Sequence, residues 1–550
     1  MNLPDMHIKY QLTILFLSVA LIATAQRTVP ADTTIKSTTI EIIQSYKPQV
    51  KQAPKPEWMP ALPPADTAHP VINYDVPQQS LFYTYSSLPL RPLALGRDTL
   101  LLPFKNYLKF GGGNLSTIYL DAGIGSIRGR DYETGLHIHH ISQNGTIKDQ
   151  QTSLSGLEAY AGLHKNKNDF RVLLTGGRNQ YSYYGGDANP YYTGDSLKQV
   201  FTSVRLMLDM ANRKDTNTKL TYHPSILASV YNAKYSTNEL TLGFNAPFTY
   251  SPDSTFDWLL GIDGVVTNFK SGQISESNNF IEIKPGIAMH DGDITGHVLA
   301  GFGLGKGNNK YILPDILATY YHAPTGLHFS AGWQASVRQN TFEQLSSLNP
   351  FLLYLDSSIF FKQTRRDEVF GQVQGKHGDH LSYSARASWN AYINMANYLN
   401  DGISNKQFYV GYQNINSLGI SLSIRYAESN IWSAGLSCDI YSYYGSSNVK
   451  IYAWQIPDKQ LKGDVIYSPN NKLSMSAYIS LLGGLYARNV SGQPISIDMN
   501  TDLGGNIEYL LIPRLSIFLQ VNNILNQKYQ RWYGYEAYGT NIYGGLRLKF

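Results

Sequence analysis

From about residue 105 to its end, the chain alternates apolar and polar residues in blocks of roughly ten. In the block Phe256 to Val266 the apolar side chains take the even positions, while Asp257 and Asp263 take odd ones. The blocks Leu473 to Leu481 and Leu157 to Leu163 alternate in the same way. A strand of this period has one apolar and one polar face. The pattern therefore predicts a long series of β-strands that are each half apolar.

The connections between these blocks alternate in length. Short polar turns are expected at His164 to Asp169, Asn212 to Lys219, Pro252 to Thr255, His290 to Asp293 and Ser468 to Asn471. Longer aromatic loops are expected at Tyr183 to Lys198, Asn340 to Ser357, Asn394 to Gln407 and Tyr443 to Lys459. Outer-membrane barrels have short periplasmic turns and long extracellular loops. Threading strands between them from Lys105 gives about 22 strands, an even number that places both barrel ends in the periplasm.

Composition narrows the fold class. Charged residues make up only 15% of the chain, against 41 tyrosines and 47 glycines, and after the first 25 residues no apolar stretch is long enough for a membrane helix. Backbone polar groups in lipid must all be paired, which for strands requires a closed barrel. We therefore predict an all-β protein with a transmembrane antiparallel β-barrel over residues 105–550. A soluble β-sandwich would alternate similarly, but its loops would be alike at both ends.

The first 25 residues have the order of an export signal. Lys9 precedes the apolar run Leu12 to Ile22, and Ala23-Thr24-Ala25 follows as a cleavage pattern. A permanent anchor would need about 20 apolar residues. The chain's one cysteine, Cys438, is far from the cleavage point, so no lipid-anchored end is expected. The mature protein should begin at Gln26 and reach the outer membrane, with its lipid as the barrel's surroundings.

Residues 26–104 differ in composition from the barrel region. Between Pro48 and Pro103 lie eleven of the chain's 25 prolines. Proline lacks the backbone donor that β-ladders need, and it favours extended conformations. We expect an extended Pro-rich segment, in the periplasm or inside the barrel lumen, rather than a globular domain.

The end of the chain resembles known membrane barrels. Its last strand, Asn541 to Phe550, looks like the signal that the barrel-assembly machinery recognises, with Tyr543, Leu546, Leu548 and Phe550 as the corresponding residues. The segment Val521 to Tyr529 just before it resembles the penultimate strand and loop of TonB-dependent receptors.

Further upstream the resemblance continues. Leu348-Asn349-Pro350-Phe351, followed by Asp367 to Gly371 and the turn Lys376 to His380, is similar to the loop-then-strand pattern of these receptors. The block Phe408 to Tyr426 matches their long descending strand. Together these segments cover roughly Asn340 to Phe550, and the strand count agrees with the family's barrel.

The front of the chain departs from that family. Family members carry a globular plug considerably larger than the Pro-rich stretch here. Thr39, Ile40, Glu41, Ile42 and Ile43 are faintly like the energy-coupling box. The nearest overall resemblance is to a plugless TonB-receptor-like barrel of Bacteroidetes-type bacteria. It implies a periplasmic or TonB-type partner for the N-terminal segment.

Few residues suggest chemistry. His137 and His139 share one face of a strand and could begin a metal site, but polar lumen lining is the favoured interpretation, and no metal is predicted. Cys438 shares a face with Leu436 and Ile440 and should face lipid. The glycine-rich run Gly301 to Gly307 lacks the phosphate-binding spacing. We predict no enzyme and no cofactor, and the modest net charge of +5 argues against a nucleic-acid partner.

Two aromatic clusters remain open. Tyr181 to Tyr184 and Arg531 to Tyr535 would form either the interfacial aromatic girdle or a binding platform for a carbohydrate or peptide.

For function, we expect passage or capture of a solute across the outer membrane. A non-transporting envelope scaffold or assembly partner is the alternative. What fills the lumen separates the two, and inward-folded loops such as Asn340 to Ser357 are expected to obstruct it.

Overall fold

The computed structural model describes residues 106–550 apart from 130, 166, 186–193, 213–218, 354–360, 402–405, 429–430, 446–449 and 490. The predicted export signal, the Pro-rich segment and the box-like residues Thr39, Ile40, Glu41, Ile42 and Ile43 lie outside the described residues. The barrel begins at Tyr107.

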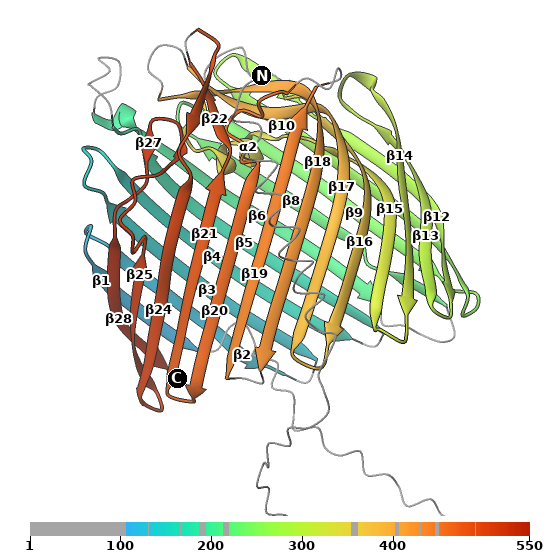
Figure 1. The fold of residues 1–550 in the computed structure, drawn as a ribbon, viewed down its shortest axis with the longest axis horizontal. Coiled ribbons are helices and arrows are strands. Elements are labelled where there is room, and N and C mark those ends of the chain that lie inside the picture. Colours follow the sequence, from blue (N-terminus) through green and yellow to red (C-terminus); the bar gives the residue numbers. More distant parts are fainter. Residues whose placement is uncertain are drawn as a thin grey trace, which may run out of the picture. The chain divides into compact units, whose positions relative to one another are not determined.

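The described chain forms a closed antiparallel barrel of 22 strands, which confirms the predicted fold class (Figure 1). The first half comprises β1 (Tyr107–Gly113), β2 (Ile118–Arg128), β3 (Tyr132–Asn144), β4 (Gln151–Lys165), β5 (Asn168–Ser182), β6 (Lys198–Asn212), β8 (Ser225–Ala233), β9 (Thr237–Tyr250), β10 (Phe256–Ser271), β12 (Phe280–Asp291) and β13 (Ile294–Leu304).

The second half comprises β14 (Lys310–His322), β15 (Leu327–Arg338), β16 (Thr364–His377), β17 (Leu381–Asn400), β18 (Phe408–Glu428), β19 (Trp432–Tyr444), β20 (Lys459–Asn470), β21 (Leu473–Gly483), β24 (Asn500–Ile512), β25 (Leu515–Asn522) and β28 (Asn541–Lys549). Two short pieces extend neighbouring ladders: β7 (Leu220–Tyr222) pairs with β9, and β11 (Ile274–Ser277) pairs with β10.

The barrel closes where the last strand pairs with the first. β28 lies antiparallel between β25 and β1. At this seam Gly111 is opposite Gly545 and Gly112 is opposite Gly544. A Cβ atom on Gly545 would collide with the carbonyl oxygen of Phe110, so the close approach of the two backbones depends on glycine here. Closure leaves no unpaired sheet edge.

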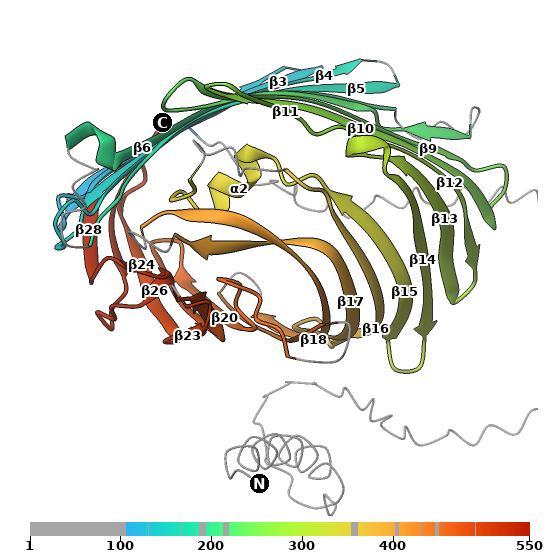
Figure 2. The same ribbon diagram turned by 90° about the horizontal axis from the view of Figure 1, so that it is seen from above.

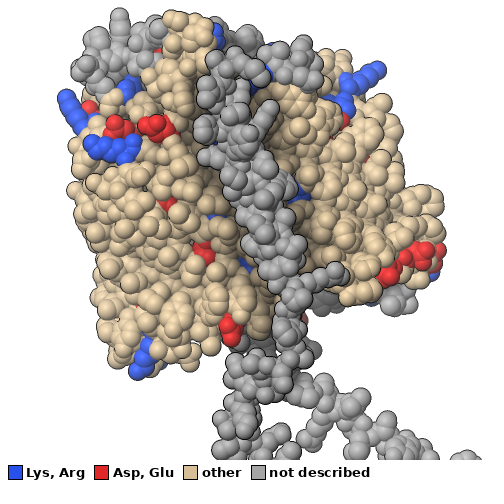
Figure 3. Space-filling model, in the orientation of Figure 1, with Lys and Arg blue, Asp and Glu red and all other residues tan. Residues whose placement is uncertain are grey.

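The outer surface carries the apolar face of the strands. In β10, Phe256, Trp258 and Leu260 are exposed, whereas Thr267 on the opposite face is buried, as the alternation predicts. Figure 3 shows a flank made largely of uncharged residues, with the larger groups of charged side chains towards its edges. This distribution is typical of a barrel whose outer surface contacts lipid.

Among the described residues, no helix is both long and apolar enough to cross a membrane.

The two ends of the barrel differ in their connections. At the turn end, the short connections include all five predicted turns, and the last strand ends there too. At the loop end lie all four predicted long loops. The helices and strands outside the barrel wall all belong to loop-end connections: η1 (Gly194–Leu197), η2 (Lys306–Asn308), α2 (Phe342–Leu348), β22 (Leu485–Arg488), β23 (Pro494–Ile497), β26 (Gln530–Trp532) and β27 (Tyr535–Glu536).

Two features of the loop end differ from the prediction. The expected loop Asn394 to Gln407 is shorter, because β17 passes through an irregularity between Tyr392 and Met395 and continues to Asn400. Burial of Tyr398 inside the barrel favours this extension. The hairpins β22–β23 and β26–β27 were not predicted either, since their strands are too short to show a period.

Candidate functional site, the loop end of the lumen

One loop-end connection turns into the barrel. It joins β15 to β16, and we call residues 339–363 the inward loop (Figure 2). Its helix α2 starts at a clear cap: Thr341 precedes the helix, and its hydroxyl oxygen accepts a hydrogen bond from the Gln344 N–H at 3.3 Å. Phe342 and Leu345 of α2 are fully buried. The helix is therefore part of the barrel interior.

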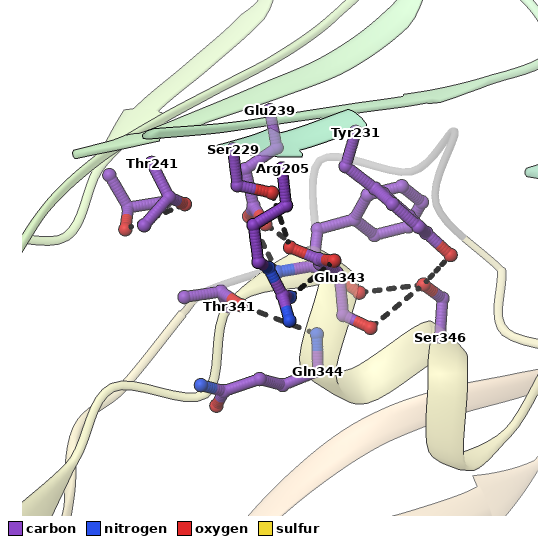
Figure 4. Close-up of polar contacts among 11 residues, drawn as sticks. Arg205, Ser229, Tyr231, Glu239, Thr241, Thr341, Glu343, Gln344 and Ser346 are labelled. Atoms are coloured by element: carbon purple, nitrogen blue, oxygen red, sulfur yellow. Dashed lines mark hydrogen bonds and ion pairs between the residues drawn. The ribbon is translucent and has the colours of Figure 1, made fainter. Parts of the chain in front are cut away.

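A carboxylate from the barrel wall completes this cap (Figure 4). Glu239 of β9 accepts the N–H of Phe342 at 2.6 Å and that of Glu343 at 2.9 Å. These N–H groups have no partner within a helix, and the negative charge is favourable at a helix N-terminus. Glu239 is 1% exposed, so its interaction with α2 is shielded from water.

Side chains of α2 also form polar contacts with the barrel wall. The Glu343 carboxylate accepts from Arg205 of β6 at 2.8 Å and from the Ser229 hydroxyl of β8 at 3.1 Å. The hydroxyls of Ser346 and Tyr231 lie 2.9 Å apart. Three adjacent wall strands, β6, β8 and β9, thus hold one side of α2 (Figure 4).

The other side of the inward loop contacts a distant part of the wall. Tyr398 of β17 donates to the Leu345 carbonyl at 3.0 Å. Phe408, the first residue of β18, exchanges backbone hydrogen bonds with the loop: its N–H donates to Phe351 at 3.1 Å and its carbonyl accepts from Leu353 at 2.7 Å. The inward loop therefore bridges the lumen between the β6–β9 and β17–β18 walls.

An aromatic core packs around this bridge. The rings of Phe351, from the inward loop, and Tyr535, from the β25–β28 connection, stack 3.6 Å apart with 8° between their planes. The buried members come from the wall and from three loops: Tyr183, Phe201, Tyr231, Phe269, Phe342, Leu345, Phe351, Leu352, Phe361, Tyr398, Phe408, Trp532 and Tyr535. Residues far apart in sequence thus pack together at the loop end of the lumen.

This core corrects the interpretation of the two aromatic clusters. Tyr183, Trp532 and Tyr535 are 4%, 6% and 3% exposed, so they form neither a lipid-facing girdle nor an exposed platform. The physical reason is that Tyr183 follows an inward-facing position of β5, while the β25–β28 connection folds back over the lumen. Tyr184 belongs to the same packing, and its hydroxyl donates to the Glu536 carbonyl at 2.5 Å. Burial raises the pKa of Tyr184 to about 12.

Two cations are partly buried among these loops. Lys406, beside β18, donates to the Gly534 carbonyl at 2.9 Å and to the Gly185 carbonyl, joining three loops. Burial lowers the pKa of Lys406. Arg531 of β26 donates to the Gln455 carbonyl at 3.0 Å, and burial lowers its pKa as well.

The histidine pair belongs to the polar lumen lining. His137 lies 3.2 Å from the Asp121 carboxylate, and the His137 and His139 rings are 5.8 Å apart. Nowhere in the described chain do three or more His, Cys, Asp or Glu side chains gather as a metal site would require. Cys438 is partly exposed beside the outward-facing Leu436 and Ile440.

The glycine-rich run is the end of β13 passing into a loop. That run, Gly301 to Gly307, includes the last residues of β13 and the start of η2.

The assembly-signal residues lie on two faces of β28. Ile542, Leu548 and Phe550 are exposed on the outer surface, and the alternation of the strand places Leu546 on the same face. Tyr543 points into the barrel, where it is 8% exposed and its ring lies 5.3 Å from that of Tyr119. Their role in assembly stays a prediction.

No family model and no curated relative matches the chain. Among solved structures, it is similar to the FrpB iron transporter from Neisseria meningitidis, with a TM-score of 0.63, 12% identity and 82% of each chain covered. It is also similar to the copper transporter OprC, with a TM-score of 0.60 and 12% identity over 81% of this chain and 80% of that one. The pyoverdine outer membrane receptor FpvA from Pseudomonas aeruginosa PAO1 has a TM-score of 0.62 and 12% identity, over 81% and 78%.

These likenesses establish a fold. The 22-strand barrel has the fold of outer-membrane receptors and transporters, which confirms at the level of fold the resemblance to TonB-dependent receptors. The neighbours are named as transporters and receptors rather than enzymes.

Proposed function

We propose that the protein is an outer-membrane barrel that supports passage or capture of a solute, with its loop end outside and no conventional plug. One observation carries the proposal. The loop end of a wide barrel is bridged by the inward loop, which the wall holds through hydrogen bonds and one ion pair. A barrel of 22 strands has a lumen too wide for its own wall side chains to fill. The inward loop is held by these polar contacts and by packing in the aromatic core, all of them non-covalent, and we infer that it opens to admit a solute.

The N-terminal segment would bind a partner protein in the periplasm. The faint likeness of Thr39, Ile40, Glu41, Ile42 and Ile43 to an energy-coupling box supports contact with a TonB-type protein. In this proposal the chain is exported through residues 1–25, assembled by the barrel-assembly machinery and left in the outer membrane, where it acts without catalysis.

The test loosens the inward loop at its cap. Glu239→Ala removes the acceptor of two helix N–H groups, each costing about 1–3 kcal/mol if left buried without a partner. We expect faster hydrogen exchange in residues 342–348 and a larger single-channel conductance in planar bilayers. Glu239→Gln keeps one acceptor oxygen and should give a smaller change.

The matched control is another lumenal carboxylate. Asp257 pairs with His290 at 3.1 Å, and no hydrogen bond or ion pair joins it to the described residues of the inward loop. Asp257→Ala should leave both the exchange of α2 and the conductance as in the wild type. Faster exchange of α2 with no gain in conductance would contradict passage through the loop end and favour the scaffold alternative.

A further inference from the structure

A cavity of about 490 Å³ lies inside the barrel beside the inward loop. Its wall residues come from β15, β16 and β17, and the rest from the inward loop, the β19–β20 connection and β26. The volume falls within the range of small-molecule sites. The cavity adjoins the aromatic core through Leu345, Tyr398 and Trp532. It would open to any solute admitted by movement of the inward loop.

The charged groups that line this cavity are all cations. They are Arg338, Arg366 and Arg531, and no carboxylate belongs to its lining. Arg366 is compensated by Glu368 at 2.9 Å. In the described parts of the chain, neither Arg338 nor Arg531 forms an ion pair with a carboxylate.

The two uncompensated arginines keep donors available. Arg338 has one long contact, from Nε to the Gln344 side chain at 3.4 Å. Arg531 uses one nitrogen on the Gln455 carbonyl, and its guanidinium lies 4.3 Å from the centre of the Trp532 ring. A stacked guanidinium presents its N–H groups at its edge, in the geometry that carboxylate and phosphate accept. Arg531 is partly buried, and taking a cation out of water is costly unless an anion joins it.

A second observation points to a missing acceptor. Gln455 lines the same cavity and is fully buried, and among the described residues its side-chain Nε2 has no hydrogen-bond partner. Its Oε1 accepts from the Tyr533 N–H at 3.4 Å, which fixes the orientation of the amide. The backbone of Gln455 has a positive φ of 61°. A buried donor without an acceptor, held on a strained backbone, is a feature that usually has a purpose.

We propose that this cavity binds a small anionic solute through carboxylate or phosphate groups. Arg338, Arg531 and Gln455 donate to its acceptors, and Tyr392, Met395 and Trp532 contact its apolar part. The inference rests on the proposed function, because it names the class of solute that the barrel would take up or hold.

Binding of matched probes tests the idea on the full-length protein in detergent. Benzene-1,3,5-tricarboxylate and phenyl phosphate supply the two anion chemistries, and the neutral benzene-1,3,5-tricarboxamide is the shape control. Calorimetry should show that at least one anion binds and that the amide does not. The anion that binds more tightly shows whether the cavity prefers a carboxylate or a phosphate group. Arg531→Gln and Arg338→Gln should each weaken binding at least about tenfold.

Controls separate the site from the general lumen charge. Arg171→Gln removes a cation of β5 that does not line the cavity and should leave the affinity unchanged. Heat-modifiable migration reports whether each variant folds. Arg531→Lys keeps the positive charge at this position and gives a second measure of how binding depends on that charge. Each probe is also measured on Glu239→Ala, where the inward loop is loosened.

Three results would each overturn the proposal. The anions and the amide could bind equally well, neither anion could bind to the wild type or to Glu239→Ala, or Arg171→Gln could lose as much affinity as the cavity variants. The conductance change in Glu239→Ala does not depend on which solute binds. Solute passage can therefore stand when the anion site fails.

Discussion

The loop end of the lumen contains polar groups whose burial is only partly compensated. Asp458 lies in the β19–β20 connection, and one of its carboxylate oxygens has no hydrogen-bond partner in the part of the chain that the structure describes; burial raises its pKa. Its backbone is well tied: its N–H donates to Gly483 at 3.2 Å and its carbonyl accepts from Tyr441 at 2.7 Å. The backbone contacts thus keep the Asp458 side chain in a partly buried position, where its charged form is disfavoured.

Replacing Asp458 by Asn should stabilise this connection at neutral pH. A carboxyl whose pKa is raised on folding stabilises the fold below its ordinary pKa of 3.8, and that contribution is lost as the pH rises through the raised value. The variant should therefore show stronger hydrogen-exchange protection than the wild type at pH 7, with the difference vanishing in acid. A difference that stays constant with pH would count against this account.

Asp253 serves as a control because its pKa is shifted in the opposite direction, downwards. It lies in a turn-end connection, where the N–H groups of Phe256 and Thr255 each donate to its carboxylate at 2.8 Å and lower its pKa. Its stabilisation exists above the ordinary pKa and is lost as the pH falls. Asp253→Asn should therefore weaken protection of this turn at pH 7.

At this scale, period-two alternation predicted which side chains face lipid. Trp258 and Leu548 are exposed on the outer surface as expected. The alternation gave no sign that Glu239 would cap a helix or that Arg531 would line a cavity. Both depend on loops folding across the lumen, and Glu239 meets its partner Phe342 about a hundred residues later, so no local pattern marks the contact.

At the scale of elements, the last strand makes two ladders at once. β28 pairs with β25 and with β1, so the barrel cannot close until this strand is in place. Phe550 follows it, with its side chain 68% exposed and its N–H donating to the Asn106 carbonyl at 3.1 Å. Its aromatic ring contributes little to packing within the barrel, which leaves it available for recognition.

Phe550→Ser should therefore lower the yield of folded barrel several-fold in outer-membrane fractions, with little effect on the melting temperature of the barrel that does fold. Lys549→Ser is the neighbouring control, since that side chain lies on the other face of the strand. Abundance and heat-modifiable migration are the measurements. Normal abundance of the Phe550 variant would show that the terminal aromatic is not part of an assembly signal.

Two exposed glycine turns at opposite ends of β13 test the orientation of the barrel. Gly292 precedes the strand and Gly307 follows it, and both have open space around their Cα atoms. An epitope tag inserted after Gly307, at the loop end, should be reached by antibody on intact cells. The same tag after Gly292 should be reached only after the outer membrane is permeabilised. The reverse result would invert the topology.

Turn and loop lengths, read from sequence, thus predicted the positions of nine connections between barrel strands, although the loop Asn394 to Gln407 is shorter than expected. They could not show α2 or the two loop hairpins, because a helix of two turns and strands of two to four residues are too short to carry a period.

At the scale of the whole molecule, the lumen must be obstructed or the barrel is a pore. In the described residues the obstruction is the inward loop with its aromatic core, all at the loop end. We propose that the Pro-rich segment builds no globular plug, because each proline removes one N–H from possible ladders and restricts the residue before it. We therefore expect obstruction by two separate parts of the chain.

Separate parts should act independently on conductance. Removing residues 27–103 should raise the small conductance of the purified protein in planar bilayers, and adding Glu239→Ala should raise it further, because that substitution loosens the loop end without touching the N-terminal segment. The double change should then exceed either single one. A large wild-type conductance, unaffected by the deletion, would falsify the obstructed barrel and leave an open pore. If Glu239→Ala raised the conductance and the deletion did not, the whole barrier would lie in the inward loop.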